Sequence, residues 1–467
     1  MQEENDIMAL KITIKEINYE CKGGDFAMFM KKIGMILLAF MLILCNGASA
    51  SALTVQASFN DPLIEEAGQA FAGDAVKILE SGQNVLQSML SQSSAIDIYI
   101  LNSSGQEYDS IFARRYMCDL SGNAAIAAFT GQLYPQIQEV VAQDGAIYGV
   151  PLALHPSEGM AYNRALLEQM NLALPATWEE YFQLLLDLPA ILAGYDDVYA
   201  FEPYLTRDMV RGTLLRSFVG AYIDCVSQDG KEFRFDTEAF RTILHLFEQI
   251  DFSGLRIPEE GQSVLYEYDM ANVLFAMESA SMQSDMEILL LRLEEGDSPI
   301  WPVSLEVAFV NPYSPNQEQA IAFLAEATAH IRDNTRVQMM PGENEPILNA
   351  NYQAALENYD QQIAEMEALL ETAPDEEKRF VEDQLAAMRE YRDDYAREGQ
   401  YSVTAEQIAQ YRQTAQFLAV KRYIGVEDTN SYLQQIAQYL TGALSAEELI
   451  QALDTTVTMM VLESGNS

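Results

Sequence analysis

Strand-like and helix-like patterns alternate along residues 53–101, and this alternation constrains the fold more than any other feature of the sequence. The strand-like stretches combine β-branched residues with period-two alternation, and turn-forming residues such as Asn102-Ser103-Ser104-Gly105 end them. The stretches between them place apolar residues at helical spacing. The pattern predicts strands at 53–59, 75–80 and 96–101 and helices at 63–71 and 84–90. A strand–helix alternation of this kind predicts an α/β layer structure.

The chain is too long for a single ordinary core. Its 467 residues suggest two or three domains, and a hydrophobic content of 49% is enough to bury sizeable cores. Length and composition therefore predict a folded, multidomain protein rather than a disordered one.

Acidic residues strongly outnumber basic ones. The 70 Asp and Glu against 27 Lys and Arg give a formal net charge of −43. Because nucleic acid and anionic lipid repel such a surface, neither is expected as a partner. The excess predicts a highly soluble, secreted surface and says little about a ligand.

The four cysteines form neither a disulfide framework nor a metal-binding spacing. Cys21 and Cys45 lie in or before an apolar segment near residue 40, and Cys118 and Cys225 lie far apart in the rest of the chain. Either one bridge joins the last two or both are buried thiols, and buried thiols are the expectation.

Residues 30–50 have the three parts of a secretory signal peptide. Met30-Lys31-Lys32 is a basic start, 33–44 is an apolar run, and 45–50 ends in small residues. The apolar run is shorter than the ~20 residues that a transmembrane helix needs. Cleavage is expected after Ala50 or Ala52, which would place the remaining chain outside the cell.

The leader leaves two questions open. Lys22-Gly23-Gly24 can be encoded by a purine-rich ribosome-binding sequence just before Met28, so we interpret 1–29 as an extension from a misassigned start. Cys45 suits a lipidated cysteine, but Leu44 stands where lipoprotein signals carry a small residue. Ordinary cleavage or a retained membrane anchor is therefore favoured over lipidation.

Helix and strand patterns recur after residue 150. Thr177 followed by Glu180 predicts a capping box at the start of a helix, and the region 181–293 is mainly helical in pattern. A strand is expected at 301–310 and an apolar helix at 320–329. Ser445 with Glu448 predicts a second capping box before the last helix.

A change of composition near Asn349 predicts an antiparallel helical hairpin. Apolar residues recur at spacings of four and three over 352–370, Thr372-Ala373-Pro374-Asp375 interrupts them, and the pattern resumes over 381–395. This periodicity is typical of coiled-coil packing. The hairpin is either a structural insertion, which we favour, or a docking arm for a partner.

Several short motifs follow one another between about residues 95 and 460. They are Ile96-Asp97-Ile98-Tyr99, Cys118-Asp119-Leu120-Ser121, Tyr134-Pro135 with 144–151, Tyr162-Asn163 with 175–180, Val310-Asn311-Pro312 with Ser314 and Asn316, and Gly442 with Ser445, Glu447 and Glu448. The ordered set resembles the extracellular solute-binding proteins of ABC importers, specifically the sugar-type (family 1) group of Gram-positive bacteria. Residues 53–95 match that family poorly, and the predicted hairpin is an insertion.

The resemblance implies a periplasmic-binding-protein-like (Venus flytrap) fold, in which two α/β lobes close about a hinge over a ligand. It implies a monomer that captures a small nutrient, with a carbohydrate favoured, and delivers it to ABC permease membrane subunits. No cofactor, metal or enzymatic step is implied. The expected division is a misassigned extension at 1–29, a signal peptide at 30–50, lobe 1 at 53–155, lobe 2 at 156–299, a return to lobe 1 at 300–340, a hairpin insertion at 349–425 and C-terminal helices at 426–464.

Ligand contacts are expected in the loops after strands, because ligands bind at the carboxyl ends of strands in open α/β sheets. A sugar site needs carboxylates, amides and a flat aromatic ring. The candidate ligand-binding residues are Asn60, Asp61, Asn102, Ser103, Tyr108, His155, Glu158, Tyr162 and Trp301. Several have a plainer interpretation: the Asn60-Asp61 and Asn102-Ser103 segments also suit ordinary turns, His155 a solitary exposed histidine, and Trp301 a core residue.

The sequence fits two other classes of function less well. An exported hydrolase is disfavoured, because the sequence has no Gly-x-Ser-x-Gly elbow and no His-Glu-x-x-His motif, and His155, His245 and His330 are scattered. A surface scaffold or sensory partner that uses the hairpin, with a degenerate cleft, is the main alternative.

Overall fold

The computed structural model describes residues 52–57, 62–72, 76–80, 84–157, 159–201, 206–229, 234–255, 262–268, 286–421, 423 and 431–464. The predicted signal peptide, Cys45 and the extension at 1–29 lie outside these residues. All the elements that follow belong to the unit Leu53–Ser467. Within the described part of the chain, no helix combines the length and apolarity needed to cross a lipid bilayer.

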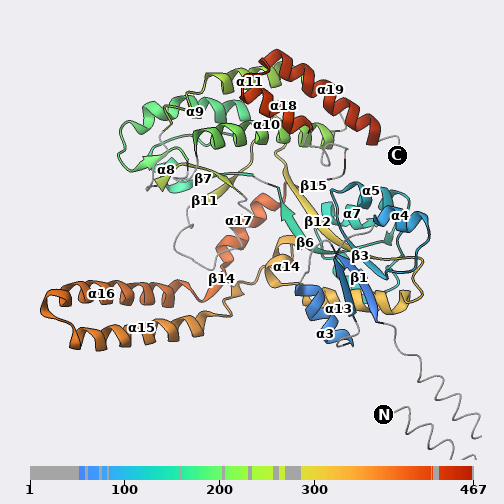
Figure 1. The fold of residues 1–467 in the computed structure, drawn as a ribbon, viewed down its shortest axis with the longest axis horizontal. Helices are drawn as coiled ribbons and strands as arrows, with labels where there is room; N and C mark the ends of the chain where they lie inside the picture. Colours follow the sequence, from blue (N-terminus) through green and yellow to red (C-terminus); the bar gives the residue numbers. More distant parts are fainter. Residues whose placement is uncertain are drawn as a thin grey trace, which may run out of the picture. The chain divides into compact units, whose positions relative to one another are not determined.

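The first lobe is built on a six-stranded sheet of order β15-β12-β3-β1-β2, in which β6 also pairs with β12 (Figure 1). β1 runs parallel to β2 and β3, whereas β12 is antiparallel to β3 and β6. The strands are β1 (Leu53–Ala57), β2 (Val76–Glu80), β3 (Ile98–Asn102), β6 (Val150–Pro156), β12 (Trp301–Val310) and β15 (Leu418–Val420). The strands predicted from the pattern near residues 53, 75, 96 and 301 are confirmed.

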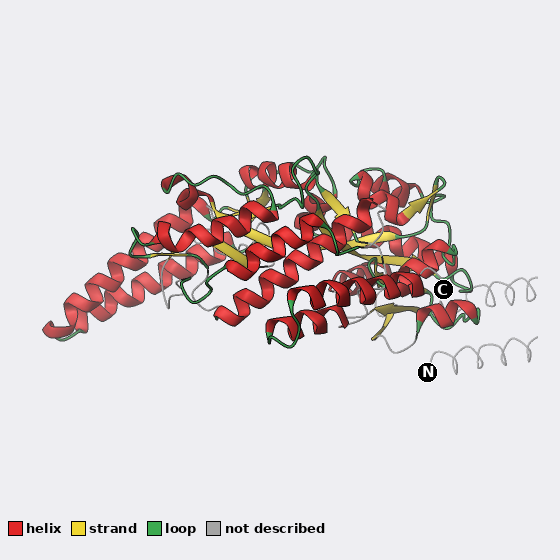
Figure 2. Ribbon diagram, turned by 90° about the horizontal axis from the view of Figure 1, so that it is seen from above, coloured by secondary structure: helices red, strands yellow, loops and turns green. Residues whose placement is uncertain are grey.

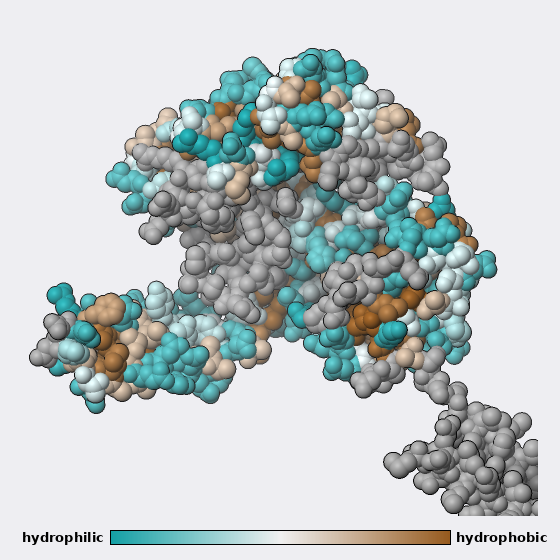
Figure 3. All heavy atoms as spheres, in the orientation of Figure 1, coloured by the Kyte–Doolittle hydropathy of each residue, from teal (hydrophilic) through white to brown (hydrophobic). Residues whose placement is uncertain are grey.

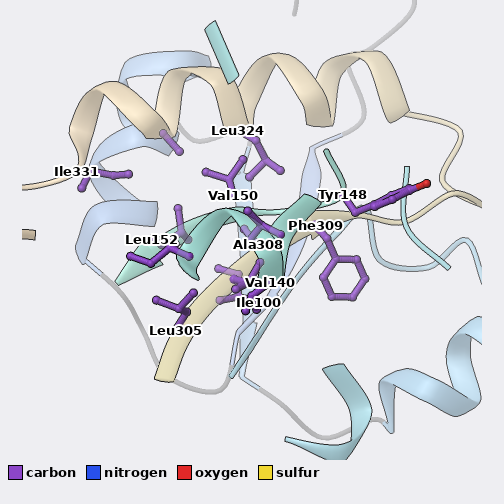
Figure 4. Close-up of a cluster of buried hydrophobic side chains, with 14 of the residues drawn as sticks. Ile100, Val140, Tyr148, Val150, Leu152, Leu305, Ala308, Phe309, Leu324 and Ile331 are labelled. Carbon is purple, nitrogen blue, oxygen red and sulfur yellow. The ribbon is translucent and has the colours of Figure 1, made fainter. Parts of the chain in front are cut away.

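Helices cover this sheet and complete the core of lobe 1. They are α3 (Pro62–Ala72), α4 (Val85–Leu90), α5 (Gln106–Ala113), α6 (Ala124–Thr130), α7 (Pro135–Val141), α13 (Gln317–His330), α14 (Asp333–Met339) and α17 (Ala405–Ala415). Leu324 points from α13 toward Val150 and Ala308 of the sheet, and all three side chains are buried (Figure 4). Burial of such apolar side chains between a helix and a sheet is the main force that holds the lobe together.

The Asp97 carboxylate links its own segment to β1 and to the turn before α13. The carboxylate accepts hydrogen bonds from the backbone N–H of Thr54 at 2.8 Å, the hydroxyl of Ser314 at 2.5 Å and the side-chain amide of Asn316 at 3.2 Å. Asn311 adds to this junction, because its side-chain amide donates to the carbonyls of residues 93 and 96. Two of the motifs that carried the family resemblance therefore hold strand ends together.

The second lobe is mainly helical, as the pattern over 181–293 predicted. Its helices are α8 (Arg164–Gln169), α9 (Trp178–Leu192), α10 (Arg207–Asp229), α11 (Glu238–Gln249), α18 (Ser431–Leu440) and α19 (Ala446–Ser464). A small sheet of order β10-β7-β11 completes it, with β7 (Gly159–Asn163), β10 (Leu265–Tyr268) and β11 (Met286–Leu289). Aromatic rings of α9, α10 and α11 pack together in its core: Phe182 meets Trp178 and Phe218 edge-to-face and Phe247 at a tilt. The C-terminal helices belong to this lobe, since Ile436 and Leu453 lie in the same buried cluster.

The described chain passes between the two buried cores at three places. It leaves lobe 1 after β6 to enter β7, returns from β11 to β12, and leaves again after β15 to reach α18. Several chain crossings between two lobes are the arrangement found in hinge-bending binding proteins. Short two-stranded ladders complete the architecture: β4 (Ala142–Gln143) with β5 (Ala146–Ile147), β8 (Val198–Tyr199) with β9 (Gln262–Ser263), and β13 (Ile347–Leu348) with β14 (Tyr401–Val403).

The predicted helical hairpin is present as α15 (Tyr352–Thr372) and α16 (Asp375–Glu398), which run side by side (Figure 2). Pro374 lies between them, where the pattern placed the break. After the hairpin, α17 and β15 pack in lobe 1: Tyr411 lies in its core, and β15 pairs with the start of β12. The range expected for the insertion, 349–425, therefore takes in residues that belong to the lobe-1 core.

Both predicted helix caps form, but in one of them the second hydrogen bond comes from a neighbouring residue. Ser445 and Glu448 exchange side-chain-to-backbone hydrogen bonds, as a capping box requires. Thr177 accepts from the N–H of Glu180 at 3.2 Å, but the Glu180 carboxylate accepts from Ala176 rather than from Thr177. The second contact is thus displaced by one residue from the capping-box pattern.

The two cysteines of the described chain are thiols and are only partly buried. The alternative of a Cys118–Cys225 bridge is therefore wrong. Burial raises the pKa of the Cys118 thiol to about 11, so the group stays protonated at neutral pH.

Candidate functional site

A cavity of about 480 Å³ lies at the hinge, between residues of the two lobes. We call it the hinge pocket. Lobe 2 contributes residues of α9, α10, β11 and α18 to its lining. The lobe-1 side contributes residues just after β6, at the start of β12 and just after β15. Its lining includes Ser157, Trp178, Arg216, Asp224, Trp301, Pro302, Lys421 and Tyr432. A concave, partly apolar site with a few polar groups is the usual form of a small-molecule site.

An ion pair crosses the hinge pocket from one lobe to the other. Lys421 Nζ, just after β15, lies 3.0 Å from Asp224 Oδ2 on α10. The backbone N–H of Lys421 donates to the carbonyl of Val303, which fixes the lysine beside β12. Burial holds the pKa of the Asp224 carboxyl above its usual range, and Lys421 opposes that shift. The pair therefore contributes a charged, water-poor surface on which a polar ligand can make strong hydrogen bonds.

Two indole rings line the same pocket. Trp178 is buried, and no acceptor among the described residues lies within hydrogen-bond distance of its Nε1. Trp301 packs edge-on against Tyr411 with ring centroids 5.4 Å apart. A buried indole N–H normally has a partner, because the unpaired group costs about 1–3 kcal/mol. Trp178 is therefore a buried wall residue of the pocket whose N–H is not satisfied by the described residues.

A row of polar side chains leads along the lobe-1 sheet from the hinge pocket. We call it the polar stripe: Asn102, His155, Ser304 and Glu306. Asn102 Nδ2 donates to Ser304 Oγ at 3.2 Å and to Glu306 Oε1 at 3.3 Å, and His155 Nε2 lies 4.0 Å from Glu306 Oε1. The His155 side chain is 50% exposed and that of Glu306 is 6% exposed, so the stripe has an accessible end and a buried end.

The polar stripe and part of the hinge-pocket wall lie on one face of β12. Ser304 pairs with His155, and Glu306 pairs with Asn102, across the neighbouring strands. Alternate residues of a strand point to the same side, so Pro302, Ser304 and Glu306 share a face, and Pro302 already lines the pocket. Each step of two residues covers roughly 7 Å. A ligand of sugar size can therefore reach from the pocket to the first groups of the stripe.

A second polar cluster lies on the small sheet of lobe 2. The hydroxyl of Tyr162 donates to the Glu287 carboxylate, and Arg164 Nη1 lies 3.0 Å from Glu287 Oε1. Burial, followed by the nearby Glu287 carboxylate, raises the pKa of the Tyr162 phenol above its ordinary value. Tyr162 therefore remains a hydrogen-bond donor across the physiological pH range.

The structure brings some of the predicted ligand-binding residues together and separates others. Asn102 and His155 meet in the polar stripe, and Trp301 lines the hinge pocket three residues before Ser304. Tyr162 lies apart from them in the cluster with Glu287. Asn60, Asp61 and Glu158 lie outside the described residues.

Two further predicted ligand-binding residues, Ser103 and Tyr108, make hydrogen bonds within lobe 1. The hydroxyl of Ser103 is buried and accepts a hydrogen bond from the N–H of Leu305 at 2.9 Å, which extends the pairing of β3 with β12. Tyr108 is buried, stacks on Phe112 and donates to the carbonyl of Val140 at 2.8 Å. Both side chains are thus occupied by lobe-1 contacts.

Sequence reasoning missed Ser304, Glu306, Asp224 and Lys421. A signal for the first two exists, since polar residues alternate with apolar ones in Val303-Ser304-Leu305-Glu306-Val307. Asp224 and Lys421 carry no such signal, because only the tertiary fold brings α10 and β15 together. Among the described residues, no group of His, Cys, Asp and Glu side chains could hold a metal ion.

Comparisons with known proteins agree with this architecture. No family model and no curated protein matches the sequence. Among solved structures, a cyclic alpha-maltosyl-1,6-maltose binding protein from Arthrobacter globiformis matches with a TM-score of 0.50 and 16% identity, covering 88% of this chain and 99% of that one. A maltose-bound MalE3 of T. maritima matches with a TM-score of 0.47, 12% identity and coverages of 87% and 99%.

An ABC transporter solute-binding protein from Agrobacterium radiobacter K84, in complex with ribitol, matches with a TM-score of 0.46 and 14% identity, covering 88% of this chain and 98% of that one. At 16% identity, the likeness to the Arthrobacter globiformis binding protein speaks for the fold and not for the ligand. The chain has the two-lobed α/β fold of that protein.

Proposed function

We propose that this chain is an exported solute-binding protein that captures a small carbohydrate between its lobes and delivers it to an ABC importer. The observation that carries the proposal is the hinge pocket, a cavity at the crossing strands that holds two indole rings and an interlobe ion pair. The protein from Arthrobacter globiformis, which shares the fold, is a cyclic alpha-maltosyl-1,6-maltose binding protein. Export rests on the signal peptide predicted at 30–50.

The chemistry of the site suits a sugar. Carbohydrates present C–H groups on the ring face, which pack on indoles, and hydroxyls at the ring edge, which pair with charged and amide groups. The Asp224–Lys421 pair and the polar stripe supply polar contacts, and Trp301, which is buried against Tyr411, contributes an apolar part of the pocket wall. A closed cleft also excludes water, which makes each unmade hydrogen bond costly and favours a ligand of matching shape.

A thermal-shift panel tests the proposal. The chain without its first 50 residues is heated with monosaccharides, oligosaccharides, polyols, peptides and polyamines. A ligand at 100 times its dissociation constant stabilises the native state by about 2.7 kcal/mol, so one class of carbohydrate should raise the melting temperature. A panel in which only peptides or polyamines act would overturn the carbohydrate assignment.

Site variants locate the binding surface. Trp178→Phe removes the indole N–H and keeps an aromatic ring, and loss of one hydrogen bond should weaken binding about tenfold. Ser304→Ala tests the polar stripe in the same way. Ser121→Ala, an exposed serine of lobe 1 bonded to Asp119, is the matched control and should leave affinity unchanged.

A further inference from the structure

We propose that the hairpin of α15 and α16, here called the arm, is a docking surface for a protein partner whose contact face carries an apolar patch ringed by Lys and Arg. The arm is not needed to cover a core. None of the buried apolar clusters of the described residues includes a residue of 352–398, and α15 has no buried residue at all. Because the arm belongs to none of these buried clusters, its exposed surface is available to a partner.

The arm exposes large apolar side chains. Phe380 is 68% exposed, Tyr391 is 65% exposed and Leu369 is 54% exposed. Phe380 and Tyr391 are eleven residues apart on α16, which is three turns, so they lie on the same side of the helix. Figure 3 shows hydrophobic surface on the arm bordered by hydrophilic surface. Apolar groups with a polar border are typical of protein-binding surfaces.

The charge of the arm selects the kind of partner. Residues 352–398 contain 14 Asp and Glu against five Lys and Arg, a net charge of −9. Arg389, Arg392 and Arg397 are already paired within the arm, to Glu367, Asp360 and Asp394. The surface left for a partner is therefore dominated by carboxylates. A second copy of the chain or an anionic membrane would be repelled, whereas a basic protein face is complementary.

The arm can be removed without breaking the lobe. Its two ends meet at the base, where the N–H of Asn349 donates to the carbonyl of Gln400 at 3.0 Å and β13 pairs with β14. The side-chain amide of Asn349 also donates to the carbonyl of Gly399 at 3.0 Å. A short Gly-containing turn can replace 352–398 and join these ends, so the arm and the lobes can be tested separately.

The test uses a labelled synthetic helix with one leucine face and one lysine face, together with an otherwise identical helix in which glutamate replaces lysine. Fluorescence anisotropy measures the binding of each to the full chain. We expect the lysine helix to bind, the glutamate helix not to bind, and the affinity to fall as NaCl is added. Phe380→Glu and excision of the arm should each weaken binding at least tenfold.

Matched controls separate the arm from the rest of the acidic surface. Met209→Glu alters another exposed apolar residue outside the arm and should leave binding unchanged. Equal binding by the excised chain would overturn the proposal, and so would preferential binding of the full chain to anionic vesicles or self-association in sedimentation. If the excised chain fails to fold, the Phe380→Glu and Tyr391→Glu variants decide. A carbohydrate-induced thermal shift in the excised chain shows that the two proposals stand or fall separately.

Discussion

A few side chains hold together segments that are distant in sequence. Asp97 is the clearest case, because one buried carboxylate joins β1 to the turn before α13 and accepts three hydrogen bonds. Charged acceptors make stronger hydrogen bonds than neutral ones, and a buried donor that loses its partner costs the full desolvation penalty. The residue therefore matters to the stability of lobe 1 rather than to ligand chemistry.

Replacing Asp97 should measure that role. Asp97→Ala removes the shared acceptor and leaves the N–H of Thr54 and the side chains of Ser314 and Asn316 without it. We expect a loss of about 3 kcal/mol in the free energy of unfolding, measured by urea titration. Asp187→Ala, an exposed carboxylate on α9, should change stability by less than about 0.5 kcal/mol. Equal effects of the two substitutions would contradict the assignment.

The Asp224 carboxyl predicts a specific dependence on pH. Burial raises its pKa in the folded state, and Lys421 offsets that only in part. A carboxyl whose pKa is raised by folding contributes stability that is present below the unfolded pKa, about 3.9, and is lost as pH rises through the folded value. The wild-type free energy of unfolding, relative to that of Asp224→Asn, should therefore be highest near pH 3–4 and fall toward neutral pH. Urea unfolding of both proteins across this range measures it, and a difference that grows with pH would refute it.

At the scale of elements, the start of α19 shows how local sequence sets local structure. Ser445 and Glu448 form a reciprocal cap that satisfies backbone groups at the helix start. Elements with such signals, or with strong period-two or helical spacing, were predictable: β1, β3, β12 and the arm are examples. β15 was not, because Leu418-Ala419-Val420 becomes a strand only through pairing with Trp301-Pro302-Val303.

The cap of α19 can be tested within one helix. Ser445→Ala should lower the free energy of unfolding by about 1 kcal/mol, since the cap is lost. Thr455→Ala lies in the exposed middle of the same helix, where the threonine hydroxyl bonds the carbonyl of residue 451. It should be neutral or slightly stabilising, because alanine has the higher helix propensity. Two substitutions with the same sign and size would show that the cap has no special role.

At the scale of the whole molecule, the two-lobed organisation was predictable from the sequence and the binding surface only in part. Ordered motifs and α/β alternation pointed to two lobes. Asn102, His155 and Trp301 stay predictions as ligand contacts, and the structure places them on β3, β6 and β12. Ser103 and Tyr108 were not distinguishable from ligand contacts, because burial depends on packing that no local pattern records. Asp224 and Lys421 meet across the hinge from positions 197 residues apart, so only the fold reveals the pair.

Titration calorimetry of the chain without its first 50 residues, using the carbohydrate found by thermal shift, tests the central claim most directly. The account predicts saturable binding of one ligand per chain, weakened about tenfold by Trp178→Phe and unchanged by Ser121→Ala. Absence of any binding heat with carbohydrates, or continuous heat from turnover of the ligand, would contradict it.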